Sequence, residues 1–99
     1  MSLEQKLSGD IAAAMKAREA TKLATYRMLK AALTNKSIEK GRTLEPAEEM
    51  QVVAAAVKQR RDSIEQFTAG NRPELAAKEA AEIAVLETLL PPAASAEEL

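Results

Sequence analysis

The sequence predicts an all-α fold, in which four helices form an antiparallel, bundle-like domain. Alanine is the most common residue, only Tyr26 and Phe67 are aromatic, and β-branched residues are few and scattered. Apolar residues recur at helical spacing in four segments, and each segment is bounded by residues that start or stop helices. Because the connections between these segments are short, sequential helices are expected to pack antiparallel.

The first two helices are predicted from their ends. Ser2 has capping-box spacing with Gln5, so that a hydroxyl and an amide can each satisfy a backbone N–H group. Gly9 weakens the first helix without ending it. The second helix is expected from about Thr21 to Gly41, because glycine suits the left-handed residue that closes a helix. The apolar stripe of the first helix contains Leu3, Leu7, Ile11, Ala14 and Met15.

The third helix is expected to begin near Pro46 and to reach about Ala69. Proline is favoured in the first turn of a helix, where its missing N–H costs nothing. Glu48 and Glu49 stand near the positive end of the helix dipole, and we expect both to be exposed cap residues. Gly70 then supplies the stop signal.

The fourth helix is expected to start after Asn71 as its cap and to run to Leu90, where two prolines break it. Residues 1–91 would therefore form one helical domain. The last segment, 92–99, reads as a linker or as the start of a further C-terminal helical domain.

The composition also narrows the possible chemistry. The chain contains no cysteine and no histidine, which removes a thiol nucleophile, the most common general base and the most common metal ligands. We therefore predict no catalytic residue, no metal site and no cofactor, and a serine activated by a lysine is the enzymatic alternative that stays open. Without a signal-peptide pattern or a membrane-spanning apolar run, the expected location is the cytoplasm.

Two adjacent arginines interrupt the apolar stripe of the third helix. Arg60 and Arg61 flank that stripe, and Glu82 falls within the stripe of the fourth helix. If the two helices pair antiparallel about Gly70, both arginines lie near Glu82. Because buried charges must be paired, we interpret Arg60, Arg61 and Glu82 as a structural ion pair that fixes the helix register. The alternative is that the arginines reach outward to an acidic partner. The stripe of the third helix collects Met50, Val53, Val57, Ile64 and Phe67.

Residues 16–42 form a basic segment, with eight Lys or Arg residues against Glu19 and Glu39. Lys22, Tyr26 and Lys30 lie close to one face of the second helix, with Arg27 to one side. Cations around an aromatic ring can bind a nucleic-acid backbone. The competing interpretation is an ordinary core stripe edged by solvated lysines. That stripe would consist of Leu23, Tyr26, Leu29 and Leu33.

Three stretches together resemble the YqeY family, small bacterial proteins related to the C-terminal region of GatB, the tRNA-binding subunit of the glutamyl/aspartyl-tRNA amidotransferase. These stretches are "YRMLKAAL" (26–33), "SIEKGRTLEPAE" (37–48) and "VKQRRDSIEQFTAGNRPELAAKEAAEIAVLETLLP" (57–91). The resemblance implies an N-terminal helical domain of that family. It also carries a carbon–nitrogen ligase label with glutamine as amido donor, which comes from kinship with GatB.

The resemblance implies an accessory tRNA-binding module without catalysis of its own, associated with an amidotransferase or an aminoacyl-tRNA synthetase. The expected phosphate contacts are Lys22, Arg27, Lys30, Lys58 and Arg61. The alternative is a protein-interaction or oligomerisation module that binds no nucleic acid. Exposed Met28 and Ile38, or the small residues "VVAAAV" of the third helix, would supply its surface. The sequence leaves the oligomeric state open.

Overall fold

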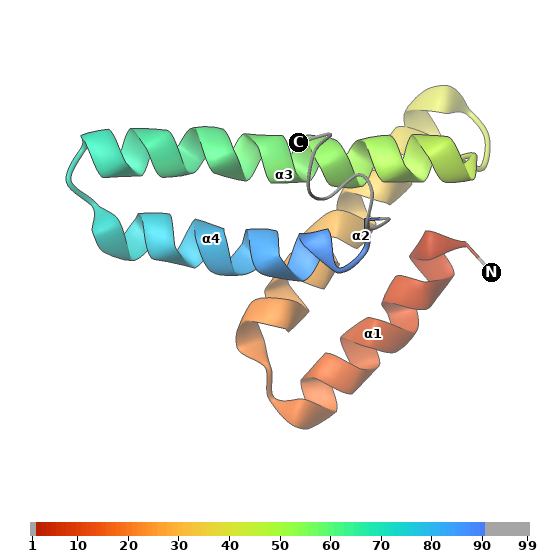
Figure 1. Cartoon of the computed structure of the whole chain (residues 1–99). Helices are drawn as coiled ribbons and strands as arrows, with labels where there is room; N and C mark the ends of the chain where they lie inside the picture. Colours follow the sequence, from red (N-terminus) through yellow and green to blue (C-terminus); the bar gives the residue numbers. More distant parts are fainter. Residues whose placement is uncertain (1, 91–99) are drawn as a thin grey trace. The chain divides into compact units, whose positions relative to one another are not determined.

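The computed structural model describes residues 2–90 and contains four helices (Figure 1). These are α1 (Leu3–Ala17), α2 (Ala20–Lys40), α3 (Pro46–Ala69) and α4 (Pro73–Glu87). The predicted all-α class is confirmed. The chain divides into two compact units, residues 1–52 and 53–99, so that the boundary lies within α3. The break expected at the paired prolines and the linker expected at 92–99 fall outside the described residues.

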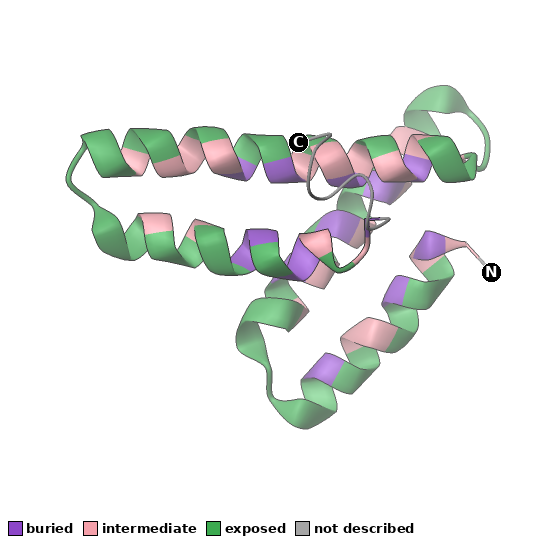
Figure 2. Cartoon of the chain, viewed as in Figure 1, coloured by how far each residue is buried: buried purple, intermediate pink, exposed green. Residues whose placement is uncertain are grey.

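In the first unit, α1 and α2 form an antiparallel helical hairpin (Figure 1). The capping box of Ser2 and Gln5 is present at the start of α1. Arg18 ends α1 in the left-handed region, with φ 58°, and its N–H donates to the carbonyls of Ala14 and Met15. Buried positions recur along one side of α1 (Figure 2). The buried apolar residues of this hairpin are Leu3, Leu7, Ala14, Leu29 and Leu33.

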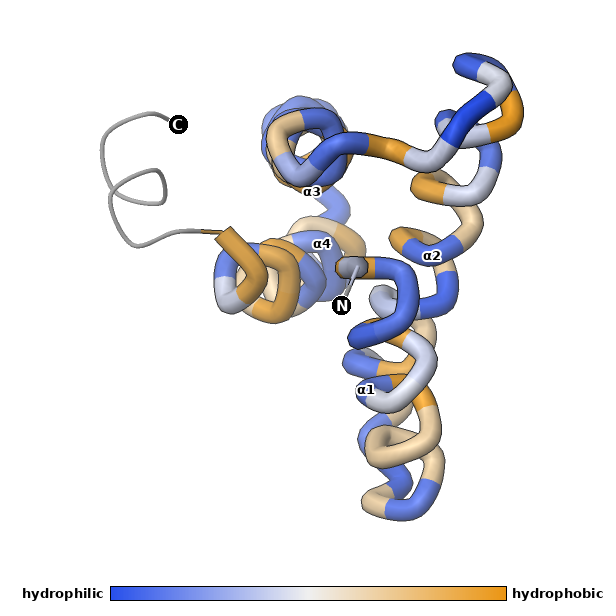
Figure 3. Tube along the Cα trace, turned by 90° about the vertical axis from the view of Figure 1, so that its right-hand side faces the viewer, coloured by the Kyte–Doolittle hydropathy of each residue, from blue (hydrophilic) through white to orange (hydrophobic). Residues whose placement is uncertain are grey.

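In the second unit, α3 and α4 run antiparallel, joined by a tight turn at residues 70–72 (Figure 1). Hydrophobic positions gather towards the C-terminal end of α4 (Figure 3). At the opposite end of the hairpin, every residue from 68 to 75 is exposed (Figure 2). The apolar core therefore lies at one end of this hairpin, and its buried residues are Val53, Val57, Ile83, Val85, Leu86 and Leu90.

Two predicted features of α4 are wrong, and the first is its cap. Asn71 does not cap the helix. It takes the left-handed conformation of the turn, with φ 60°, and Arg72 occupies the cap position without a side-chain bond. Asparagine is one of the few residues that tolerate this region of backbone space.

The second wrong feature is the end of α4, which lies at Glu87 and not at Leu90. The amides of Thr88, Leu89 and Leu90 each donate to a carbonyl three residues earlier, and the Thr88 hydroxyl donates to the Val85 carbonyl at 2.6 Å. Bonds over three residues tighten the last turn, as helix ends commonly do. The α-helix therefore stops before the prolines.

Candidate nucleic-acid interface

The first unit holds Lys22, Arg27 and Lys30 of the predicted phosphate contacts, all on α2. Lys22 is exposed, and its Nζ lies 3.5 Å from Glu19 Oε2. Arg27 is exposed, and its Nη2 lies 3.8 Å from the sulfur of Met15 on α1. Lys30 is half-buried. Arg27 and Lys30 are therefore the two α2 candidates without an acidic partner in the described part of the chain.

Arg27 and Lys30 line a shared hollow between α1 and α2. The hollow has a volume of about 490 Å³. The two cations lie one turn or less apart on the helix, so both can approach a single anionic group. The lining residues are Ile11, Arg27, Lys30, Ala31, Thr34 and Asn35.

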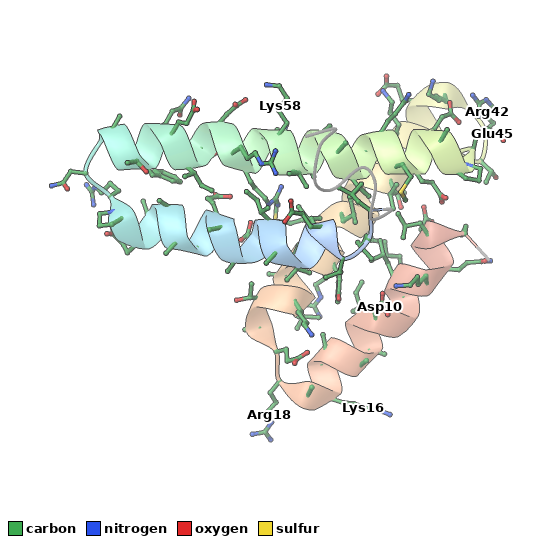
Figure 4. The ribbon with its side chains drawn as sticks, viewed as in Figure 1. Asp10, Lys16, Arg18, Arg42, Glu45 and Lys58 are labelled. Carbon is green, nitrogen blue, oxygen red and sulfur yellow. The ribbon has the colours of Figure 1, made fainter. Side chains whose placement is uncertain are left out.

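Two further cations stand at the turn between α1 and α2. Lys16 and Arg18 project away from the hairpin (Figure 4), and no acidic side chain among residues 2–90 pairs with either. The sequence prediction did not single them out, although both belong to the basic segment 16–42. They were missed because no glycine indicates the position of the turn between α1 and α2 in the sequence.

At the other end of α2, the positive charge is neutralised. Arg42 donates two hydrogen bonds of 2.8 Å to the carboxylate of Glu48, and Lys40 Nζ lies 3.1 Å from the same group. The Glu45 amide adds a third hydrogen bond of 2.8 Å to that carboxylate. The hydrogen bonds from Arg42 make the largest contribution, and the one from the Glu45 amide the next, to holding the pKa of Glu48 well below its usual range. Figure 4 shows Arg42 and Glu45 at the connection between α2 and α3.

The expectation that Glu48 and Glu49 are exposed is wrong. The side chain of Glu48 is 16% exposed because Arg42 and Lys40 cover it. Glu49 is buried, and its Oε2 accepts a 3.0 Å hydrogen bond from the amide of Leu3. Glu49 therefore caps the first turn of α1, a helix 46 residues earlier in the chain. No local sequence signal indicates so distant a contact.

The second unit holds Lys58 and Arg61, the other two predicted phosphate contacts. Lys58 points outward from α3 (Figure 4), and its Nζ lies 3.1 Å from Asp62 Oδ2. Arg61 Nη2 lies 3.2 Å from Glu87 Oε2 on α4, and both side chains are partly exposed. Each of these cations already has an acidic neighbour.

The structure brings Arg60 and Glu82 together across the α3–α4 hairpin. Arg60 Nε donates to Glu82 Oε1 at 2.9 Å, and the two side chains are only 8% and 10% exposed. Arg60 Nη1 also donates to the carbonyl of Ala56 at 3.0 Å. Arg61 does not join this pair, contrary to expectation. Because adjacent helical residues point about 100° apart, its side chain meets Glu87 instead.

No group of acidic side chains within residues 2–90 is arranged to hold a metal ion. Over the same range, no helix has both the length and the apolar character needed to cross a bilayer.

Comparison with known proteins identifies the family. Residues 4–99 match the Yqey-like protein family. The chain is also 33% identical over 82 residues to "Altered inheritance of mitochondria protein 41, mitochondrial" from Saccharomyces cerevisiae strains YJM789 and Lalvin EC1118. That alignment covers 82% of this chain and 44% of each yeast protein, so the chain spans less than half of their length. The chain belongs to the YqeY-like family.

Proposed function

We propose that this chain is an accessory tRNA-binding module without catalysis of its own, and that it contacts tRNA through the α1–α2 hairpin. The observation that carries the proposal is the pairing pattern of the cations. Arg27 and Lys30 line one hollow without an acidic partner in residues 2–90, whereas Lys58 and Arg61 lie beside Asp62 and Glu87. Charges without a partner keep more attraction for phosphate.

The proposed mechanism is electrostatic docking. Arg27 and Lys30 bind backbone phosphates, and Lys16 and Arg18 at the α1–α2 turn extend the positive surface. Lys22 contributes less, because its Nζ lies 3.5 Å from Glu19 Oε2. Contacts to phosphates hold an RNA in place but carry no sequence information. The module would therefore position a tRNA by its shape and charge, and a partner enzyme would perform the chemistry.

The proposed partner is an amidotransferase or an aminoacyl-tRNA synthetase, on the basis of the family resemblance. We propose a cytoplasmic location. The names of the yeast relatives place those proteins in mitochondria, and the same electrostatic contact would serve in either compartment.

A salt titration tests the proposal. Unfractionated tRNA is titrated into the whole chain and into Arg27→Ala/Lys30→Ala at several salt concentrations. The variant should bind more weakly, and its log–log salt slope should be smaller by about two units, because two phosphate contacts no longer release counterions. Lys58→Ala/Lys78→Ala removes the same charge from the second unit and serves as the matched control.

Two outcomes would overturn this proposal. If the wild-type chain binds no tRNA at low salt, the function is wrong. If the control variant loses as much slope as the α2 variant, the binding follows net charge and the hairpin surface is wrong.

A protein-docking function is the second candidate, because α2 also carries large exposed apolar side chains. Met28 is 53% exposed and Ile38 is 73% exposed. Apolar side chains on a helix surface are common recognition sites for other proteins. Sedimentation at increasing protein concentration tests self-association, and Ile38→Ser should abolish any dimer that forms through this surface.

A further inference from the structure

The hollow between α1 and α2 contains more than positive charge. Arg27 and Lys30 stand at one end of its α2 wall, and Thr34 and Asn35 follow about one helical turn further along. A turn rises about 5.4 Å, so the neutral polar groups lie a short distance beyond the cations. An anionic group and a hydroxyl of the same ligand can therefore be bound side by side.

The hydroxyl of Thr34 is available for a ligand. Threonine in a helix often satisfies its hydroxyl on a backbone carbonyl, and Thr25 does so by donating to the Thr21 carbonyl at 2.8 Å. Thr34 is half-buried and makes no such bond within residues 2–90. Its neighbour Asn35 is exposed and offers both a donor and an acceptor.

The remaining walls suit a sugar ring. Ile11 of α1 and Ala31 of α2 add apolar side chains to the lining of the hollow. The hollow is shallow and largely open to solvent, so that it can contact one unit of a longer strand. A ribose–phosphate unit combines the features that these walls fit: one negative charge, an apolar ring edge and a hydroxyl.

We propose that this hollow holds one ribose–phosphate unit of an RNA strand, with the phosphate on Arg27 and Lys30 and the 2′-hydroxyl on Thr34 and Asn35. The inference rests on the proposed function and adds to it, because phosphate contacts alone do not separate RNA from DNA. The 2′-hydroxyl is the group by which proteins make that distinction. The α1–α2 hairpin of the protein would thereby distinguish RNA from DNA without recognising a base sequence.

The experiment compares the affinity of the protein for two oligonucleotide hairpins of identical base sequence. One is a short RNA hairpin, and the other carries 2′-fluoro groups, which keep the A-form helix and the phosphate charge but cannot donate a hydrogen bond. The whole chain should bind the RNA hairpin roughly threefold to tenfold more tightly, as expected for one or two hydrogen bonds. Thr34→Val/Asn35→Ala should remove this preference and leave the affinity for the 2′-fluoro hairpin unchanged.

One control variant checks that the effect is specific to the hollow, and three outcomes would each overturn a different claim. Thr21→Val/Gln59→Ala changes two exposed polar residues outside the hollow and should keep the preference. Equal binding of the two hairpins by the wild-type chain would overturn the inference while the proposed function stands. Binding of neither hairpin, nor of unfractionated tRNA, would overturn the proposed function itself. A preference that survives in Thr34→Val/Asn35→Ala would overturn the assignment, because the 2′-hydroxyl would then be read elsewhere.

Discussion

At the scale of single residues, the Arg60–Glu82 pair is almost fully removed from water. Its 2.9 Å contact and the low exposure of both side chains mean that each charge depends on the other. The second carboxylate, Glu79, lies 4.0 Å from Arg60 Nε and is more exposed. Loss of Glu82 would therefore remove the short contact and keep the longer one to Glu79.

We predict that Glu82→Ala lowers the free energy of unfolding by about 3 kcal/mol, since the buried Arg60 guanidinium loses its 2.9 Å ion-pair contact. Urea unfolding followed by circular dichroism measures this change. Glu87→Ala is the control. Its ion pair with Arg61 is partly exposed, and its loss should change stability by about 1 kcal/mol or less. Equal losses in the two variants would contradict the prediction.

Glu48 gives a prediction about pH. Its pKa is lower in the folded chain than in the unfolded chain, because Arg42 and the Glu45 amide stabilise the charged carboxylate. The stability that Glu48 contributes is therefore fully present above the ordinary carboxyl pKa of about 4.3 and is lost as the pH falls towards the folded pKa.

Thermal unfolding of the wild-type chain and Glu48→Gln tests this sign. The wild-type chain should melt at the higher temperature near neutral pH, and the difference should shrink once the pH falls below about 4. A difference that stays constant into strong acid would mean that the charge of Glu48 does not stabilise the fold.

At the scale of helices, the start of α1 depends on α3. The Leu3 amide donates to the buried carboxylate of Glu49, while Ser2 and Gln5 satisfy each other locally. Two separate sets of hydrogen bonds therefore cap the start of α1. One is local, and the other comes from a distant segment of the chain.

We predict that Glu49→Ala destabilises the chain by about 1–3 kcal/mol, because the buried Leu3 amide loses its acceptor. Glu49→Gln keeps an acceptor oxygen and should cost less. Hydrogen exchange at the Leu3 amide, measured beside global unfolding, separates the local effect from the global one. The cap would have no energetic role if both variants exchanged and unfolded like the wild-type chain.

The helices show which features a sequence can predict. The capping box at Ser2, the closure at Gly41 and the extent of α3 depend on neighbouring residues, and the sequence predicted them. The end of α1 was harder to predict, because Arg18 takes a left-handed conformation that usually indicates glycine.

The candidate site also has features that the sequence predicts and features that depend on the fold. The positive charge of α2 was visible in the sequence, but the acidic partners that engage Lys58 and Arg61 depend on how side chains point. Glu82 was found because the α3–α4 turn sets an antiparallel register. Glu49 was missed because its partner is 46 residues away and lies in another helix.

At the scale of the whole molecule, the net charge of −1 hides two different units. Residues 1–52 contain nine basic and seven acidic side chains, and residues 53–99 contain five basic and eight acidic ones. The first unit therefore carries a net positive charge and the second a net negative charge. If RNA binds to the first unit as proposed, its affinity should fall as the salt concentration rises.

The absence of histidine and cysteine from residues 1–99 gives a prediction about pH. With ordinary pKa values, no side chain of this composition changes its charge between about pH 6 and pH 8. The affinity for tRNA should therefore vary by less than about twofold over that range at fixed salt. Fluorescence anisotropy with labelled tRNA measures it, and a change of about tenfold would indicate that a group with a strongly shifted pKa takes part in binding.

The bond between Leu3 and Glu49 also sets an order of events during synthesis. Most contacts of the α1–α2 hairpin join residues that leave the ribosome close together in time, so that hairpin can form early. The hydrogen bond from the Leu3 amide to Glu49 nevertheless cannot form until residue 49 has been synthesised. The start of α1 is thus among the last parts of the first unit to be completed. In a nascent chain that stalls before Glu49, the capping box of Ser2 and Gln5 can form, but the Leu3 amide lacks its acceptor.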